Sequence, residues 1–136
     1  MNQTFQSEWW EATLPPGWSG IYEDDCADFT SDSEDDIGAL EISAHRNAET
    51  LAVTDVDLEE MVAEEVIENG ALLKPVQLGD FTGFYFDYQA DGVYWRTWIL
   101  RCSRTMLYAT YNCEPADKGK EDEPVEQILA TLKIRG

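Results

Sequence analysis

The sequence has little of what most catalytic sites are built from. It contains one histidine, His45, and three cysteines, Cys26, Cys102 and Cys113, without CxxC spacing. Hydrolytic triads and most zinc sites need a histidine with a nucleophile or further ligands beside it, and an odd number of scattered cysteines is not typical of a disulfide or zinc framework. No GxGxxG, GxxxxGK[ST] or GxSxG motif occurs. We therefore predict a protein without catalytic activity, metal or cofactor.

Basic residues are also scarce. Nine Lys and Arg face 28 Asp and Glu, which gives a formal net charge of −19. Such a surface repels nucleic acids and anionic membranes at ordinary salt, but it steers a basic protein or peptide towards itself. We expect the surplus carboxylates to form an outer coat. The charge has a second interpretation, adaptation to a saline habitat, and composition does not separate the two.

Long apolar runs are missing as well. None approaches the roughly 20 residues of a membrane span, and the first residues, MNQTFQSEWW, lack the basic and apolar regions of a signal peptide. These absences predict a cytoplasmic protein. Core material is ample, because 43% of the residues are hydrophobic and 12% aromatic, so the chain is expected to fold despite its charge. Its length predicts one domain over residues 1–136.

Alternation and turn residues locate the expected strands. Residues 5–14, 18–23 and 27–31 are strand-like, and residues 38–45 alternate between apolar and polar, which is typical of a half-buried strand. Asp91-Gly92 predicts a two-residue hairpin turn between aromatic-rich runs. That register places Tyr85 opposite Trp98 and Asp87 opposite Arg96, so we predict a structural pair between Asp87 and Arg96. Both faces of this hairpin are aromatic, and each therefore needs cover.

Two amphipathic helices are expected to supply that cover. The first begins after Thr54 or Asp55 and ends at Asn69-Gly70. Its expected apolar stripe consists of Leu58, Met61, Val62, Val66 and Ile67. The second spans about residues 123–134, with Asp122 as its cap and an apolar stripe of Val125, Ile128, Leu129 and Leu132. The predicted fold class is α+β, an antiparallel sheet flanked by two main helices in the order β-β-(β)-β-α-β-β-β-β-α.

Several motifs together resemble the Mog1/PsbP-like superfamily. They are LPPGW after an aromatic strand, GALEISAHR, the acidic helix, LGDFTGFYFDY with WRTWIL, and VEQILATLKI. The chain is most similar to small bacterial proteins of that group. The resemblance covers nearly the whole chain and implies the same fold. Its members include a Ran-binding protein, a photosystem II subunit and secretion chaperones, which implies protein binding without catalysis. No functional residue of a member carries over.

The segment EDDCADFTSDSEDD, residues 23–36, holds eight carboxylates and one cysteine. A calcium loop starting at Asp32 fails, because Ile37 stands where Gly is required and Ser43 where the closing Glu is required. A looser cation site, a solvated loop and a docking surface for a basic partner all stay open. Adjacent strand residues point to opposite faces, so one of Trp9 and Trp10 is expected in the core and the other near the surface as an anchor. The candidate partner-binding residues are Trp9, Trp10, Trp18, Asp24, Asp25, Asp28, Asp32, Glu34, Asp35 and Asp36.

The sequence thus favours a non-enzymatic acidic module that binds a basic protein or peptide, as an adaptor, a chaperone or an immunity-type protein would. Two alternatives remain. One is a small-ligand-binding or hydrolytic domain that uses a cleft of carboxylates and tyrosines. The other is a housekeeping protein whose acidic surface reflects salt adaptation.

Overall fold

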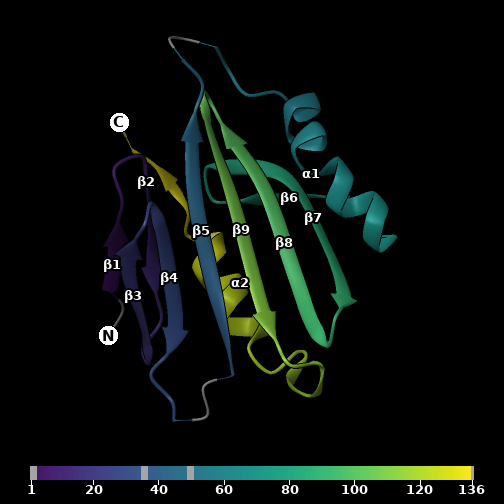
Figure 1. Ribbon diagram of the computed structural model, residues 1–136. Coiled ribbons are helices and arrows are strands. Elements are labelled where there is room, and N and C mark those ends of the chain that lie inside the picture. Colours follow the sequence, from purple (N-terminus) through teal and green to yellow (C-terminus); the bar gives the residue numbers. More distant parts are fainter. Residues whose placement is uncertain (1–2, 35–36, 49–50, 136) are drawn as a thin grey trace.

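The computed structural model describes residues 3–34, 37–48 and 51–135, and in these ranges the strands form two antiparallel sheets. The large sheet has the order β3-β4-β5-β9-β8-β7-β6, and the small sheet has the order β1-β2-β10. Figure 1 shows α1 on one side of the large sheet and α2 on the other. The strands are β1 (Gln3–Gln6), β2 (Trp10–Leu14), β3 (Trp18–Glu23), β4 (Cys26–Ser31), β5 (Gly38–Arg46), β6 (Lys74–Leu78), β7 (Phe81–Ala90), β8 (Val93–Cys102), β9 (Thr105–Cys113) and β10 (Lys133–Ile134).

The central hairpin has the predicted register. Ala90 pairs with Val93, Tyr85 with Trp98 and Asp87 with Arg96 across β7 and β8. Asp91 and Gly92 have φ angles of 52° and 76°, which fit a two-residue turn whose twist matches that of the strands. The hairpin between β8 and β9 turns at Ser103 and Arg104, because Cys102 pairs with Thr105.

Helix α1 (Asp55–Asn69) begins and ends as predicted. Thr54 and Asp57 form a reciprocal capping box at its start, and Gly70 is left-handed at its end. The predicted apolar stripe was too wide, however. Leu58 and Val62 are buried, whereas Met61 and Ile67 are 57% and 79% exposed. Leu58 and Val62 pack in the cluster beneath α1, whereas Met61 and Ile67 lie on the solvent side of the helix.

Helix α2 (Asp122–Ala130) is shorter than predicted. The apolar stripe is correct, since Val125, Ile128, Leu129 and Leu132 are all fully buried. The cap is wrong: Glu121 occupies the N-cap position and makes no side-chain capping bond. Residues Lys133 and Ile134 are strand β10, which pairs with Glu11 and Trp10 of β2. Pairing with β2 satisfies these backbone groups as another helical turn would, so the helical pattern alone did not reveal the change.

The N-terminal segment also differs from the prediction. Residues 5–14 form the end of β1, a turn and β2 rather than one strand, and β1 and β2 pair with each other. Their small sheet packs with α2 on one face of the large sheet, around a core that contains Trp10, Phe29, Leu40 and Trp98. A second core cluster lies under α1 and contains Leu58, Val62, Phe86 and Ile99. The aromatic hairpin is therefore covered on both sides, as predicted.

No helix in the described ranges has both the length and the apolar character that crossing a membrane requires. A 3-10 turn, η1 (Pro115–Asp117), leads from β9 towards α2.

Candidate functional site

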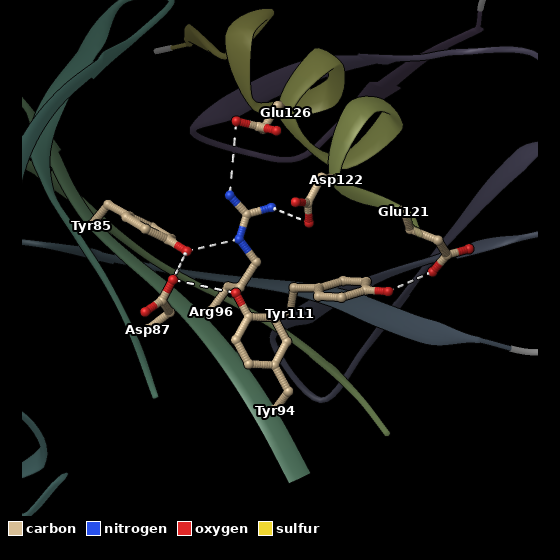
Figure 2. A network of polar contacts seen from close by, with 8 residues as sticks. All are labelled: Tyr85, Asp87, Tyr94, Arg96, Tyr111, Glu121, Asp122 and Glu126. Carbon is tan, nitrogen blue, oxygen red and sulfur yellow. Dashed lines mark hydrogen bonds and ion pairs between the residues drawn. The ribbon is translucent and has the colours of Figure 1, made fainter. Parts of the chain in front are cut away.

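Arg96 is the centre of a buried polar network between β7, β8 and α2 (Figure 2). Its side chain is 8% exposed and forms ion pairs with Asp122 at 3.0 Å and Glu126 at 3.8 Å. Its Nε donates a hydrogen bond to the Tyr85 hydroxyl at 2.9 Å, and its guanidinium lies 4.8 Å from the Trp98 ring centre. Paired and stacked in this way, the buried cation fastens α2 to the sheet.

The predicted pair of Asp87 and Arg96 is correct in register but wrong as an ion pair. The Asp87 carboxylate accepts hydrogen bonds from the hydroxyls of Tyr85 at 2.7 Å and Tyr94 at 3.3 Å. Arg96 reaches Asp87 only through Tyr85, since its own ion pairs are with the α2 carboxylates. The guanidinium points away from the strand towards α2, and a register argument within one hairpin cannot foresee a partner on a distant helix.

A second bond ties the start of α2 to the sheet. Tyr111 donates a hydrogen bond to Glu121 at 2.8 Å, and Glu121 is only 6% exposed. The expected outer coat of carboxylates is therefore incomplete, because this one is buried. Burial and the hydrogen bond to Glu121 raise the pKa of Tyr111, so the hydroxyl remains a donor. These contacts join α2 to the large sheet and are therefore structural.

The opposite face of the large sheet is different, because α1 lies mainly over β7 and β8 and reaches β9 through the contact between Glu65 and Tyr108 (Figure 1). Beyond the helix, most outward side chains of β3, β4, β5 and β9 are polar and partly exposed, but Ile21 is apolar and Thr110 is buried. We call this surface the open face. It comprises Ile21, Cys26, Asp28, Glu41, Ser43, Tyr108 and Thr110.

Glu65 of α1 marks the boundary between the covered and open parts. It accepts hydrogen bonds from the hydroxyls of Tyr88 and Tyr108, at 2.5 and 2.8 Å, and lies 3.5 Å from the Thr97 hydroxyl. Burial first, and then the hydrogen bond to Glu65, raise the pKa of both tyrosines. The tyrosines thus stay protonated at neutral pH and hold the carboxylate in place.

Asp28, Glu41 and Cys26 form the acidic part of the open face. Asp28 and Glu41 are cross-strand partners on β4 and β5, and ligand atoms of all three residues lie within 4.8 Å of one another. Asp28 Oδ1 is buried without a hydrogen-bond partner. Burial and the nearby Asp28 raise the pKa of Glu41, and burial with both carboxylates raises that of the Cys26 thiol. Carboxylates and a thiolate are possible cation ligands, and this group is where the described chain could hold one.

A hollow lies beside the edge strand β3, on the side of the small sheet. It has a volume of about 500 Å³ and is lined by Gln6, Ser7, Glu8, Tyr22, Asp25 and Arg135. A narrower hollow of about 250 Å³ shares Ser7, Glu8, Tyr22 and Asp25 and adds Trp9 and Ala44. Arg135 donates to the Ser7 carbonyl and lies 3.9 Å from Glu11. Glu8 and Asp25 form no ion pair with any residue of the described ranges.

The predicted anchors are only partly available. Trp10 and Trp18 are 1% and 7% exposed, so the prediction that they contact a partner is wrong; both side chains point inward from their strands into the main core. Trp9 is half-buried and lies beneath the Arg46 guanidinium, as the alternation of neighbouring residues predicts. The exposed predicted acids are Asp24, Asp25, Asp32 and Glu34, while Asp35 and Asp36 lie outside the described residues.

Sequence reasoning did not find Glu41, Glu65, Tyr88 and Tyr108. The alternation of β5 already placed Glu41 on a polar side, but its neighbour Asp28 follows only from the pairing of β4 with β5. Glu65 stands among the acids of α1 and looks like any other surface glutamate in the sequence. Its position one turn from Val62 and beside Val66, along the edge of the apolar stripe, was the available signal.

Together the order of elements, the two-sided cover and the antiparallel sheet define the Mog1/PsbP-like fold, and solved structures confirm it. A structure from Bacteroides thetaiotaomicron VPI-5482 matches 98% of the chain with a TM-score of 0.70 and 21% identity. This chain spans about half of that one, 48%. A mutant of protein Mog1 matches with a TM-score of 0.57 and 10% identity over 98% of this chain and 96% of its own.

A third match is the PsbP protein of the cyanobacterium Synechocystis sp. PCC 6803. It has a TM-score of 0.57 and 8% identity and covers 98% of this chain and 92% of that one. No family model and no curated sequence matches the chain. At these identities the likeness concerns the fold, and function has to be argued from the site.

Proposed function

We propose that this protein is a non-enzymatic binding module that takes a basic protein or peptide on its open face. The observation that carries the proposal is the distribution of charge. Asp28, Glu41 and Glu65 lie on or beside the open face, and no outward strand position of β3, β4, β5 or β9 in the described ranges carries Lys or Arg. A cationic surface is the electrostatic complement of such a face.

Aromatic groups add an apolar component to this surface. Tyr108 and Tyr88 flank Glu65, and Ile21 is 58% exposed on the same face beside Asp28. Tyr side chains are enriched where proteins bind each other, because they bury a large area and still offer a hydroxyl. Charge would steer the partner to the face, and these side chains would contact its apolar parts.

The protonation states favour binding over catalysis. A nucleophilic cysteine needs a lowered pKa, whereas burial and the neighbouring carboxylates raise the pKa of Cys26. The tyrosines that contact Glu65 have raised pKa values as well, so they act as hydrogen-bond donors rather than bases. An adaptor, a chaperone or an immunity-type protein is the biological form that suits such a module.

A synthetic basic peptide tests the proposal. The binding of fluorescein-labelled octalysine is measured by anisotropy at low and at physiological salt, with octaglutamate as the negative probe. We compare the wild type with the double variant Asp28→Asn/Glu41→Gln. We expect the variant to bind octalysine about tenfold more weakly, because two charges of the open face are lost.

The matched control is Glu59→Gln/Glu68→Gln on the exposed side of α1, which changes the net charge equally. The proposal expects this control to keep most of the wild-type affinity. Equal weakening in both variants would mean that octalysine responds to net charge alone, as the salt-adapted interpretation predicts. If octalysine binds at neither salt concentration, the proposal is rejected.

A further inference from the structure

Strand β3 is an edge of the large sheet with the properties of a pairing site. It pairs with β4 on one side only, and four of its six residues are exposed. Among them are two large apolar side chains, Ile21 at 58% and Tyr22 at 53% exposure. An edge strand presents unpaired backbone N–H and C=O groups, which can pair with an added strand unless something blocks them.

The opposite edge of the same sheet carries such blocks. Strand β6 begins with Lys74 and Pro75; a proline donates no ladder hydrogen bond, and an edge lysine is costly to cover. In β3 neither residue type occurs, and its sequence WSGIYE has no inward-pointing charge. The edge at β6 therefore carries residues that oppose pairing with a further strand, whereas the edge at β3 does not.

The residues around β3 indicate which side chains an added strand would carry. Its two-residue turn to β4 is Asp24-Asp25, and Asp32 lies at the other end, where its carboxylate accepts a hydrogen bond from Ser19. Side chains on one face of an added strand would lie beside Ile21 and the open face. Those on the other face would lie beside Tyr22 and the 500 Å³ hollow, where Glu8 and Asp25 have no ion pair among the described residues. Arg135 also lines this hollow, but its guanidinium is held by the Ser7 carbonyl and lies near Glu11.

A second copy of this chain fits the edge poorly. Antiparallel pairing of β3 with itself would bring two strands together whose ends both carry carboxylates, at Glu23–Asp25 and at Asp32. Like charges facing each other across strands are destabilising. A strand with lysine or arginine side chains avoids this repulsion and can extend one of them over Tyr22 towards Glu8 and Asp25.

We propose that β3 accepts an extended basic segment of a partner protein by strand addition, with a lysine or arginine of that segment in the hollow beside Tyr22. The inference rests on the proposed function and specifies how the basic partner would bind. Backbone hydrogen bonds would supply affinity, and the hollow would supply preference for a basic side chain at alternate positions.

Backbone methylation tests this mode separately from charge. The probe is an octapeptide of alternating Lys and Val, compared with two versions that carry N-methyl groups on alternate residues, one on the Lys and one on the Val amides. Methylation removes hydrogen-bond donors and leaves every charge in place. Strand addition predicts that at least one methylated version binds at least about tenfold more weakly than the parent peptide.

A pair of variants provides the second measurement. Ile21→Lys and Gln77→Lys make the same charge change at exposed positions of β3 and β6. We expect Ile21→Lys to reduce affinity for the parent peptide about tenfold and Gln77→Lys less than about twofold. Binding that is insensitive to methylation would overturn strand addition, whatever the two variants do. The proposed function would then still stand if Ile21→Lys weakens binding more than Gln77→Lys, because Ile21 also lies on the open face. Failure of the parent peptide and of octalysine to bind would reject both.

Discussion

The two halves of the large sheet handle their carboxylates in opposite ways. Around β7 and β8, both faces are covered, and each basic residue of β8 is paired: Arg96 with Asp122 and Glu126, and Arg101 with Asp55. Around β3, β4 and β5, one face is open, Asp28 Oδ1 is buried without a partner, and the pKa of Glu41 is raised. The two arginines of β8 thus stabilise the covered half, whereas the outward strand positions of β3, β4 and β5 in the described ranges carry carboxylates and no Lys or Arg.

This difference indicates which half carries the binding role. A surface tuned only for solubility would place its acids where water reaches them freely. On the open face, however, burial and mutual repulsion of carboxylates oppose folding, and a cationic partner would relieve the repulsion. The comparison predicts that substitutions lower stability in the covered half and affect binding in the open half.

The largest effect on stability is expected from Arg96→Leu. The change removes the ion pairs to α2, the hydrogen bond to Tyr85 and the stacking on Trp98. We expect a loss of about 1–3 kcal/mol in the free energy of unfolding, measured with urea. The control is Arg101→Leu, whose ion pair is 32% and 53% exposed and should matter by less than about 1 kcal/mol. Equal losses in the two variants would contradict the structural role of the Arg96 network.

Glu65→Ala comes next. It removes the shared acceptor of Tyr88 and Tyr108 and leaves two partly buried hydroxyls without it. We expect a loss of about 1–2 kcal/mol, and Glu64→Ala on the exposed side of α1 should change stability by less than about 0.5 kcal/mol. Thermal and urea unfolding check both variants. A neutral result for Glu65→Ala would show that the carboxylate does not hold α1 to the sheet.

Asp25→Gly should separate stability from binding. Asp24 and Asp25 form the turn between β3 and β4 and have φ angles of 53° and 62°. The equivalent turn between β7 and β8 has a glycine, Gly92, at its second position. Glycine adopts this conformation without steric cost, so we expect a gain of about 0.5–1 kcal/mol together with weaker octalysine binding. Asp25→Asn should weaken binding similarly with little change in stability. Unchanged binding in both variants would remove Asp25 from the proposed surface.

The smallest effect concerns the pH dependence of Glu41. Its pKa is raised in the folded protein by burial and by Asp28, so between the unfolded and folded pKa values the folded state binds more protons. Stability then falls as pH rises through this window. Glu41→Gln should flatten that part of the pH profile and stabilise the protein at pH 7 by less than about 1 kcal/mol, because solvent screens a partly exposed pair. A loss of stability at pH 7 would mean that Asp28 and Glu41 do not repel each other.

Much of the fold could be predicted from local patterns. The alternation of β5, the caps of α1 and the Asp91-Gly92 turn each depend on a few neighbouring residues, and all three are present. The separate small sheet could not be predicted, because β10 pairs with β2 across most of the chain length. The partner of Arg96 was missed for the same reason: Asp122 is close only after α2 has packed.

The candidate site was less predictable than the fold. The acidic segment was visible in the sequence, and Asp28 lies on the open face, but the burial of Trp10 and Trp18 removed two expected anchors. Glu41 lies next to Asp28 because β4 pairs with β5, and Glu65 lies at the boundary of the same face because α1 packs on the sheet. Charge composition therefore indicated the kind of partner, while tertiary structure was needed to locate the surface.

The most direct test of the central claim is a titration of ¹⁵N-labelled protein with octalysine, followed by amide chemical shifts. The account predicts that the largest shift changes fall on β3, β4, β5 and β9 and on the turn at Asp24-Asp25, with small changes in β6, β7 and α2. Shift changes spread evenly over all acidic segments, or concentrated at α2, would contradict a binding surface on the open half of the sheet.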